Sequence, residues 1–248
     1  MEQVGNNLNL PDLGNTQTYT SEHDCERCAD THWIEFDDAE GVTRAARCSC
    51  HEAAMHRLKV EKLFASAAIP KRFQGKSFAN FDVSWQPKAY EISKSYMESW
   101  SEHVNGEGLF LVGPVGTGKS HLAFAVLNGL VKRGVPGMAA TVPDLMDELR
   151  PNEAQNHNKK VEVLKTIDLL VLDDLGAQKS TEWVTERLFI ILNARYAAML
   201  PTVITSNNYL EELEKVPGWT RIIDRIVETS RIIRLEGDSY RRESRRKR

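Results

Sequence analysis

The segment from Gly113 to Ser120 has the residue types and spacing of a phosphate-binding loop. It follows a short apolar run, Leu109–Val112, and opens a segment of helical composition, His121–Lys132. In that context the glycines let backbone N–H groups close around phosphate oxygens at a helix N-terminus, where negative charge is favoured. The nucleotide-binding residues predicted from this pattern are Gly113, Pro114, Val115, Gly116, Thr117, Gly118, Lys119, Ser120 and His121.

Carboxylates at the end of a second apolar run predict the metal and hydrolysis groups. Residues 167–172 are typical of a buried parallel strand, and Asp173 and Asp174 follow directly. Lys119 is expected to reach the β- and γ-phosphates, while Ser120 and Asp173 hold Mg²⁺. Asp174 stands where a general base or water-orienting carboxylate belongs. Many ATPases with a phosphate-binding loop have Glu at this position, which is one methylene longer than Asp.

Two further polar groups follow in the chain. Asn207 comes after the apolar strand Thr202–Thr205, where it can sense the γ-phosphate or serve as a plain turn former. Arg221 and Arg225 lie one turn apart on a predicted helix, where a surface ion pair is the alternative to a functional role.

The four cysteines form two close pairs that predict a structural zinc site. Two ligands from each of two tight turns suit a tetrahedral four-thiolate site, and the segment between the pairs has the strand, turn, strand outline of a zinc ribbon. Free thiols or disulfides are the alternative, and a reducing cytoplasm disfavours disulfides. His51 and His23 could each replace a cysteine. The predicted zinc ligands are Cys25, Cys28, Cys48 and Cys50.

Composition and charge restrict the class of protein. The chain has 248 residues and a net charge of −3. It shows no apolar stretch near the roughly 18 residues of a membrane span and no signal peptide at its N-terminus, so we expect a cytoplasmic protein without a membrane partner. Residues 1–52 carry a net charge of −8, which suits a protein partner better than nucleic acid. Residues 231–248 carry +5 and could touch nucleic acid or nucleotide phosphate, or form a solvated, partly disordered end.

The remaining elements are predicted from periodicity and from Gly and Pro positions. Residues 1–20 are expected to be flexible and 151–160 to form a polar loop. Phe73, Phe78 and Phe81 could wall an adenine pocket or simply pack in the core. Helices are predicted at 52–67, 88–103, 142–150, 181–200 and 220–228, and strands at 138–141 and 231–235.

In combination, these motifs resemble the AAA+ ATPases of the DnaC/DnaI-type replicative helicase loader family, which also includes the IstB transposition ATPases. The resemblance covers about residues 69–242. The segments that carry it are Ile69–Phe73, Gly113–Ser120, Leu169–Gly176, Ile204–Asn207, Arg221–Arg225 and Ser239–Arg241.

The resemblance implies an α/β fold, an AAA+ P-loop ATPase core with a five-stranded parallel sheet, preceded here by the small zinc ribbon. It implies that Arg225 acts as an arginine finger toward a neighbouring subunit, with Arg221 as the fallback. Asn207 matches the sensor 1 residue and Arg241 the sensor 2 arginine. A guanidinium suits these tasks because its fork neutralises charge on phosphate in the transition state.

We therefore expect an Mg²⁺-dependent, slow, switch-like ATPase that uses ATP and Zn²⁺ and loads a DnaB-type replicative helicase hexamer onto single-stranded DNA. Its predicted parts are a flexible segment 1–20, a zinc-binding, helicase-interaction module with linker helix at 21–67, and an ATPase domain with basic tail at 68–248. Self-association would run through the ATPase domain. DNA contacts are expected within 142–165, including Arg150, Lys159 and Lys160.

Two other functions remain open at this point. One is an IstB-like ATPase that assists a transposase at target DNA, and the other is a nucleotide-binding adaptor with little catalysis. The zinc module and the acidic head favour the loader, because IstB-type proteins usually lack such a module.

Overall fold

The computed structural model describes residues 25–38, 40–102, 105–150, 157–178 and 180–246. The chain divides into two compact units, residues 1–56 and 57–248, and the boundary falls inside helix α1 (Cys50–Ser66). The predicted flexible segment 1–20 lies outside the described residues.

The first unit contains an antiparallel pair, β1 (Trp33–Asp37) and β2 (Thr43–Arg47). Asp38 organises the turn between them, since its Oδ1 atom accepts the backbone N–H groups of Glu40 and Val42 at 3.0 and 2.9 Å. Short polar side chains that bond nearby backbone in this way are typical turn formers. The predicted strand, turn and strand are confirmed.

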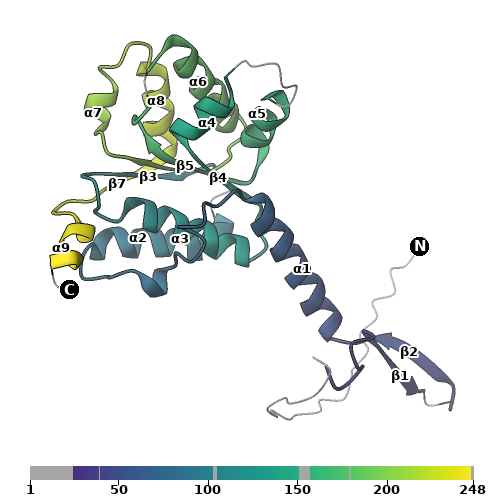
Figure 1. The fold of residues 1–248 in the computed structure, drawn as a ribbon. Coiled ribbons are helices and arrows are strands. Elements are labelled where there is room, and N and C mark those ends of the chain that lie inside the picture. Colours follow the sequence, from purple (N-terminus) through teal and green to yellow (C-terminus); the bar gives the residue numbers. More distant parts are fainter. Residues whose placement is uncertain (1–24, 39, 103–104, 151–156, 179, 247–248) are drawn as a thin grey trace. The chain divides into compact units, whose positions relative to one another are not determined.

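The second unit is built on a five-stranded parallel sheet in the order β4-β5-β6-β3-β7 (Figure 1). The sheet confirms the predicted fold class. The strands are β3 (Gly108–Val112), β4 (Gly137–Thr141), β5 (Leu169–Leu175), β6 (Thr202–Ser206) and β7 (Ser230–Arg234).

Alternate side chains of the central strands pack into two different cores. In β3, Leu109 and Leu111 join the core that contains α3 (Lys119–Lys132). Phe110 and Val112 join the core that contains α6 (Glu182–Ala197) and α8 (Thr220–Thr229). This alternation follows from the two-residue period of a strand. Figure 1 shows the same layering, with α2 (Pro87–Glu98) and α3 on one face and α4 (Val142–Glu148), α6 and α8 on the other.

All six predicted helices are present, with shifted ends. The helix predicted at 88–103 ends at Glu98 and is followed by a short 3₁₀ turn, Trp100–Glu102. The helices that match predictions are α1, α2 (Pro87–Glu98), α3 (Lys119–Lys132), α4 (Val142–Glu148), α6 (Glu182–Ala197) and α8 (Thr220–Thr229).

Three helices were not predicted. The loop predicted at 151–160 is wrong for residues 157–160, because α5 (His157–Thr166) begins there and buries Leu164 against α6; residues 151–156 lie outside the described residues. The helices α7 (Leu210–Leu213) and α9 (Tyr240–Arg246) are each shorter than two turns. Helices of that length are too short to show a hydrophobic periodicity in the sequence.

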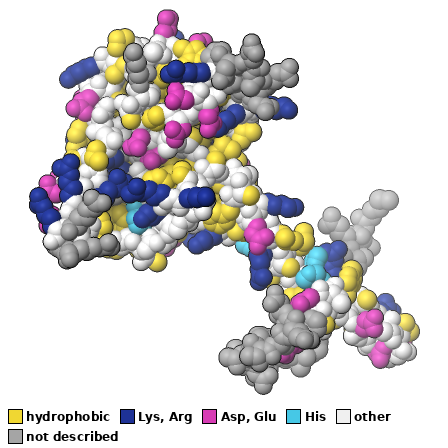
Figure 2. All heavy atoms as spheres, viewed as in Figure 1, with side chains coloured by type: hydrophobic (Ala, Val, Ile, Leu, Met, Phe, Trp, Pro, Cys, Tyr) yellow, Lys and Arg dark blue, Asp and Glu magenta, His cyan; other side chains and the backbone are white. Residues whose placement is uncertain are grey.

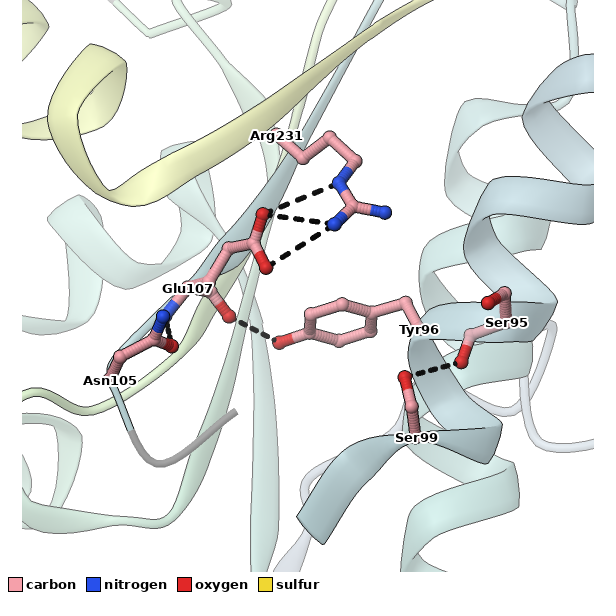
Figure 3. A network of polar contacts seen from close by, with 6 residues as sticks. All are labelled: Ser95, Tyr96, Ser99, Asn105, Glu107 and Arg231. Carbon is pink, nitrogen blue, oxygen red and sulfur yellow. Dashed lines mark hydrogen bonds and ion pairs between the residues drawn. The ribbon is translucent and has the colours of Figure 1, made fainter. Parts of the chain in front are cut away.

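Polar contacts tie the amino ends of β3 and β7 together (Figure 3). Arg231 Nη2 and Nε lie 3.2 and 3.3 Å from Glu107 Oε1, while the buried Tyr96 of α2 donates its hydroxyl to the Glu107 carbonyl at 2.9 Å. Burial raises the pKa of Tyr96, so its hydroxyl stays protonated and serves as a donor. These contacts anchor the edge strand and α2 at the edge of the sheet away from the phosphate loop.

No helix among the described residues is long and apolar enough to cross a membrane.

Candidate nucleotide site and cysteine cluster

The predicted phosphate loop connects the end of β3 to the start of α3. Gly113, Gly116 and Gly118 have φ angles of 148°, 87° and 107°, a region that glycine adopts without steric cost. At Gly116 a Cβ atom would also lie 2.1 Å from Ser239 Oγ. Glycine is therefore required both for the turn and for the close approach of the C-terminal segment.

Lys119 is buried at the base of this loop. Its Nζ donates to the carbonyls of Gly113 and Pro114 at 2.7 and 2.8 Å, which keeps the ammonium inside the loop's curve. Burial lowers the pKa of Lys119 to about 8, against the opposing attraction of Asp174 and Asp173. Lys119 is thus mostly charged at neutral pH, and its pKa lies only slightly above that pH.

The predicted carboxylates lie beside the loop. Asp173 is buried and hydrogen-bonded by the hydroxyls of Ser120 and Thr205. Burial raises the pKa of Asp173, and these two hydrogen bonds oppose the rise. The side chains of Ser120 and Asp173 therefore already meet, as two groups that share one Mg²⁺ ion must.

Asn207 and Arg241 also reach the site. Asn207 Nδ2 donates to Asp174 Oδ1 at 3.3 Å, so the predicted sensor lies against the predicted water-orienting carboxylate. Arg241 is close enough for its charge to contribute to the lowered pKa of Lys119. It stands on α9, and the Tyr240 N–H at the start of that helix donates to the Gly116 carbonyl at 3.0 Å.

A single cavity of about 880 Å³ joins these groups. Gly113 and Pro114 are in the loop but do not line the cavity. The predicted residues that line it are Val115, Gly116, Thr117, Gly118, Lys119, Ser120, His121, Asp173, Asp174, Asn207 and Arg241.

Two of the three phenylalanines predicted as a possible adenine-pocket wall lie at the nucleotide cavity. Phe73 and Phe81 line the cavity, whereas Phe78 packs edge-on against Tyr90 with ring centroids 5.6 Å apart. His121 Nε2 lies 3.0 Å from the Ser77 carbonyl and 2.9 Å from Asn80 Oδ1. Because both partners are acceptors, Nε2 carries the proton, and burial lowers the pKa of His121 so that the ring is neutral.

Sequence reasoning missed several residues of this wall. Most of them come from irregular segments or from the short α9, which show no periodicity, whereas Thr141 ends β4. Arg72 and Tyr240 lie in two segments that carry the family resemblance, but they were not singled out as site residues. The added lining residues are Arg72, Lys76, Asn80, Asp82, Trp85, Thr141, Tyr240, Arg242 and Ser244. Three of them, Arg72, Lys76 and Arg242, are cationic. Figure 2 shows a group of Lys and Arg side chains where Figure 1 draws α9. Such a surface attracts an anionic nucleotide.

Arg225 does not line its own chain's nucleotide cavity. Its guanidinium carbon lies 4.1 Å from the centroid of the Tyr196 ring, and Nη1 pairs with Glu228 Oε2 at 3.4 Å. Tyr196 in turn donates its hydroxyl to Glu228 Oε1 at 2.8 Å. Arg225 lines a separate cavity of about 560 Å³, and Arg221 is exposed.

The predicted DNA-contacting residues lie on or near α4 and α5. Arg150 pairs with Asp147 at 3.3 Å, and Lys160 pairs with Glu148. Lys159 is exposed on α5. Their role in DNA binding stays a prediction.

The four cysteines converge in the first unit. Their sulfur atoms all lie within 4.8 Å of one another, with Cys25 and Cys48 at 3.8 Å and Cys28 and Cys50 at 3.3 Å. Four sulfurs around one ion at bond lengths of about 2.3 Å would stand about 3.8 Å apart, so the cluster fits a tetrahedral metal. Among the described residues, no other group of His, Cys, Asp or Glu has this arrangement.

Of the two predicted substitute histidines, only His51 is described, and it is not part of the cysteine cluster. His51 Nε2 accepts from Arg47 at 2.6 Å, and His23 lies outside the described residues. His32, which the sequence did not single out, places Nδ1 3.4 Å from Cys50 Sγ and can hydrogen-bond a thiolate there. Outer partners of this kind orient metal ligands.

The chain is similar to known ATP-binding proteins over most of its length. A family model described as IstB-like ATP binding protein matches residues 46–248. The chain is 29% identical over 199 residues to the replicative helicase loader DnaI of Bacillus subtilis (strain 168), covering 74% of this chain and 64% of DnaI. It is 29% identical over 214 residues to the replicative helicase loader DnaC of Escherichia coli (strain K12), covering 84% and 85%.

Two further matches bear on fold and function. A putative insertion sequence ATP-binding protein of Sinorhizobium fredii (strain NBRC 101917 / NGR234) is 32% identical over 227 residues, covering 86% of this chain and 75% of that protein. The crystal structure of DnaI matches with a TM-score of 0.61 at 28% identity, covering 69% of this chain and 96% of that one.

The parallel sheet, the glycine loop and the paired carboxylates define a P-loop nucleotide-binding protein of the AAA+ class. Within that class, the chain belongs to the IstB-like ATP-binding protein family, since the family model spans far more than half of it.

ATP affinity should depend on pH through Lys119. Nucleotide phosphates favour the charged ammonium, so affinity should be full at pH 7 and should fall as pH rises through the Lys119 pKa of about 8. Calorimetric titration should show about tenfold weaker binding at pH 9 than at pH 7, with proton uptake on binding above pH 8.

Lys119→Arg is the matched control, because a guanidinium keeps its charge across this range. Whatever its absolute affinity, this variant should show a flat profile from pH 7 to pH 9. A flat profile in the wild-type protein would contradict the assignment of Lys119.

Proposed function

We propose that this protein is an ATP-dependent loader that places a replicative ring helicase on single-stranded DNA. The observation that carries the proposal is the similarity to DnaC, which covers 84% of this chain and 85% of DnaC, a protein named as a replicative helicase loader. The nucleotide cavity supplies an ATP site, and the cysteine-bearing first unit supplies a separate binding module.

In this proposal the ATP site works as a slow, Mg²⁺-dependent switch. Lys119 binds the β- and γ-phosphates, and Ser120 with Asp173 would hold Mg²⁺, which neutralises charge on the phosphates when bound. Asp174 orients the attacking water and accepts its proton, and Asn207 holds Asp174 through the 3.3 Å hydrogen bond. Arg241 stabilises the phosphate charge from within the same chain.

Arg225 acts in trans in this proposal, which its location supports. It lies outside its own nucleotide cavity and is one-third exposed, so its guanidinium is available to a neighbouring subunit. An arginine supplied in this way to a γ-phosphate raises turnover by about 10³–10⁵ in related phosphoryl-transfer sites.

Replacing Arg225 should separate binding from turnover. Arg225→Ala should keep the wild-type affinity for ATP but lose turnover in the assembled protein by about a hundredfold or more, because the transition-state charge loses its partner. Steady-state hydrolysis and fluorescent-nucleotide binding measure the two quantities separately.

Arg221→Ala is the matched control, since Arg221 lies one turn away on the same helix and is exposed. It should hydrolyse ATP at close to the wild-type rate. Normal turnover by Arg225→Ala with impaired turnover by Arg221→Ala would mean that Arg221, not Arg225, is the arginine finger.

Zn²⁺ is the metal that we propose for the cysteine cluster. Four thiolates in tetrahedral arrangement suit Zn²⁺ and leave no open position for catalysis. Within its described residues, the unit has two strands of five residues each, and none of the strand residues is buried, so its folding would depend on the metal.

Metal removal should affect the first unit alone. Elemental analysis should find one Zn²⁺ per chain, and Cys48→Ser should lose it while ATP affinity stays unchanged. Limited proteolysis should then cut the variant within residues 25–56. His51→Ala, whose ring pairs with Arg47 instead of a sulfur, should retain zinc; loss of zinc from that variant would contradict the four-cysteine assignment.

The loader function is tested by complex formation with the ring helicase from the same source. Size-exclusion chromatography with light scattering, with and without ATP and Mg²⁺, should show a stable complex of this protein with the helicase hexamer. A Cys48→Ser, Cys50→Ser double variant should lose the complex, with ATP affinity as the control that its core is folded. Lys119→Ala should bind the helicase without nucleotide.

The second candidate function is assistance to a transposase at target DNA. The 32% identity to a putative insertion sequence ATP-binding protein favours it. The absence of any helicase complex, with zinc bound and ATP affinity intact, would overturn the loader and favour this role.

A further inference from the structure

Asp173 and Asp174 present a geometric problem that neither side chain solves. They are consecutive residues of β5, and consecutive side chains of a regular strand point to opposite faces. Both nevertheless line the nucleotide cavity, where Asp173 meets Ser120 and Asp174 meets Asn207. Some feature of the sheet must turn one of them.

A local irregularity in the pairing of β5 with β6 provides the turn. The register runs regularly to Leu172 opposite Ile204 and resumes at Leu175 opposite Ser206. Two residues of β5 therefore stand against the single residue Thr205 of β6, which is the arrangement of a β-bulge. Asp174 has a φ of 58°, a left-handed conformation that is uncommon for any residue but Gly, Asn or Asp.

The Thr205 side chain occupies this irregularity. Its hydroxyl donates to Asp173 Oδ1 at 2.6 Å and accepts the backbone N–H of Asp174 at 3.0 Å. Thr205 is fully buried, so water cannot replace either contact. One hydroxyl thus holds both residues of the bulge, the first through its carboxylate and the second through its backbone.

The next residue of β6 continues the same pattern. Ser206 Oγ donates to the Leu175 carbonyl at 2.7 Å where regular pairing resumes. The hydroxyls of two consecutive β6 residues therefore hold β5 on both sides of the register shift.

We propose that Thr205 is a positioning residue of the nucleotide site: its hydroxyl fixes the bulge that aims Asp173 at the Mg²⁺ position beside Ser120 and Asp174 at the attacking water beside Asn207. This proposal deepens the proposed ATPase activity and rests on it. Thr205 itself touches neither nucleotide nor metal, because it does not line the cavity.

The alternative is that the hydroxyl only satisfies buried polar groups and contributes to stability. The two roles differ in what its removal changes. A purely structural loss lowers the free energy of unfolding and leaves the folded site unaltered. A positioning loss changes metal affinity and turnover in a protein that is folded and binds nucleotide.

The test is Thr205→Val, which keeps the β-branched shape and removes the hydroxyl. Mn²⁺ binding to the complex with a non-hydrolysable ATP analogue, followed by electron paramagnetic resonance, should weaken about tenfold or more. Turnover should fall about 10- to 100-fold, while nucleotide affinity in EDTA stays within about threefold of wild type, since Lys119 and the loop are untouched.

Two variants serve as controls. Thr205→Ser keeps the hydroxyl and should have the metal affinity and turnover of the wild-type protein. Thr202→Val makes the same change on the same strand and also removes a buried hydrogen bond, from Arg195 Nε at 2.9 Å, but lies away from the nucleotide cavity. It should lower the melting temperature and leave Mn²⁺ affinity unchanged.

Each outcome decides the proposal. The proposal would be overturned if Thr205→Val and Thr202→Val had equal Mn²⁺ affinity and turnover. It would also be overturned if Thr205→Ser lost Mn²⁺ affinity and turnover as Thr205→Val does. If Thr205→Val does not fold, Thr205→Ala carries the same expectations. A wild-type protein that binds the Mn²⁺–nucleotide complex without hydrolysing ATP would overturn the proposed ATPase activity, while the Mn²⁺ measurement would still decide the role of Thr205.

Discussion

The parallel pairing of β3 with β6 on one side and β7 on the other is the constraint on which the nucleotide site depends. Because all five strands run in the same direction, their carboxyl ends meet at one edge of the sheet. The glycine loop leaves β3 there, Asp173 and Asp174 lie near the end of β5, and Asn207 follows β6. The segment after β7 returns to the same edge and places Arg241 beside the loop.

The opposite edge of the sheet is held by a buried cation. Arg195 is fully buried, and its guanidinium donates to the carbonyls of Leu164, Ile167 and Pro201 at 2.6 to 2.9 Å. Burial lowers its pKa to about 10, so it remains charged at neutral pH. These bonds connect α5, the approach to β5 and the approach to β6. A charge buried without such partners would strongly destabilise the fold, so this edge has one well-defined arrangement.

The sheet, the phosphate loop and the cysteine cluster could be predicted because each has a signal in the chain itself. Leu109–Val112 and Leu169–Leu172 are continuous apolar runs, and the loop and the cysteines have fixed spacings. The rest of the cavity wall could not be predicted, because residues such as Asn80 and Trp85 belong to irregular or very short elements that only tertiary packing brings together. The role of Thr205 could not be predicted for a different reason. A threonine in a strand is ordinary, and its importance depends on a register shift that no local pattern marks.

The position of Arg225 bears on how the site can work. Four of the proposed catalytic groups, Asp173, Asp174, Asn207 and Arg241, line one cavity within one chain, whereas Arg225 faces a different cavity. A single chain can therefore bind nucleotide with its own groups, but the proposed transition-state arginine must come from another copy. Hydrolysis would then report assembly. Since Arg225 packs on Tyr196 and pairs with Glu228 in the isolated chain, a neighbour's γ-phosphate must compete with those contacts for its guanidinium. Under the proposed arrangement in trans, that competition would slow turnover in the free protein, so that ATP hydrolysis would depend on assembly.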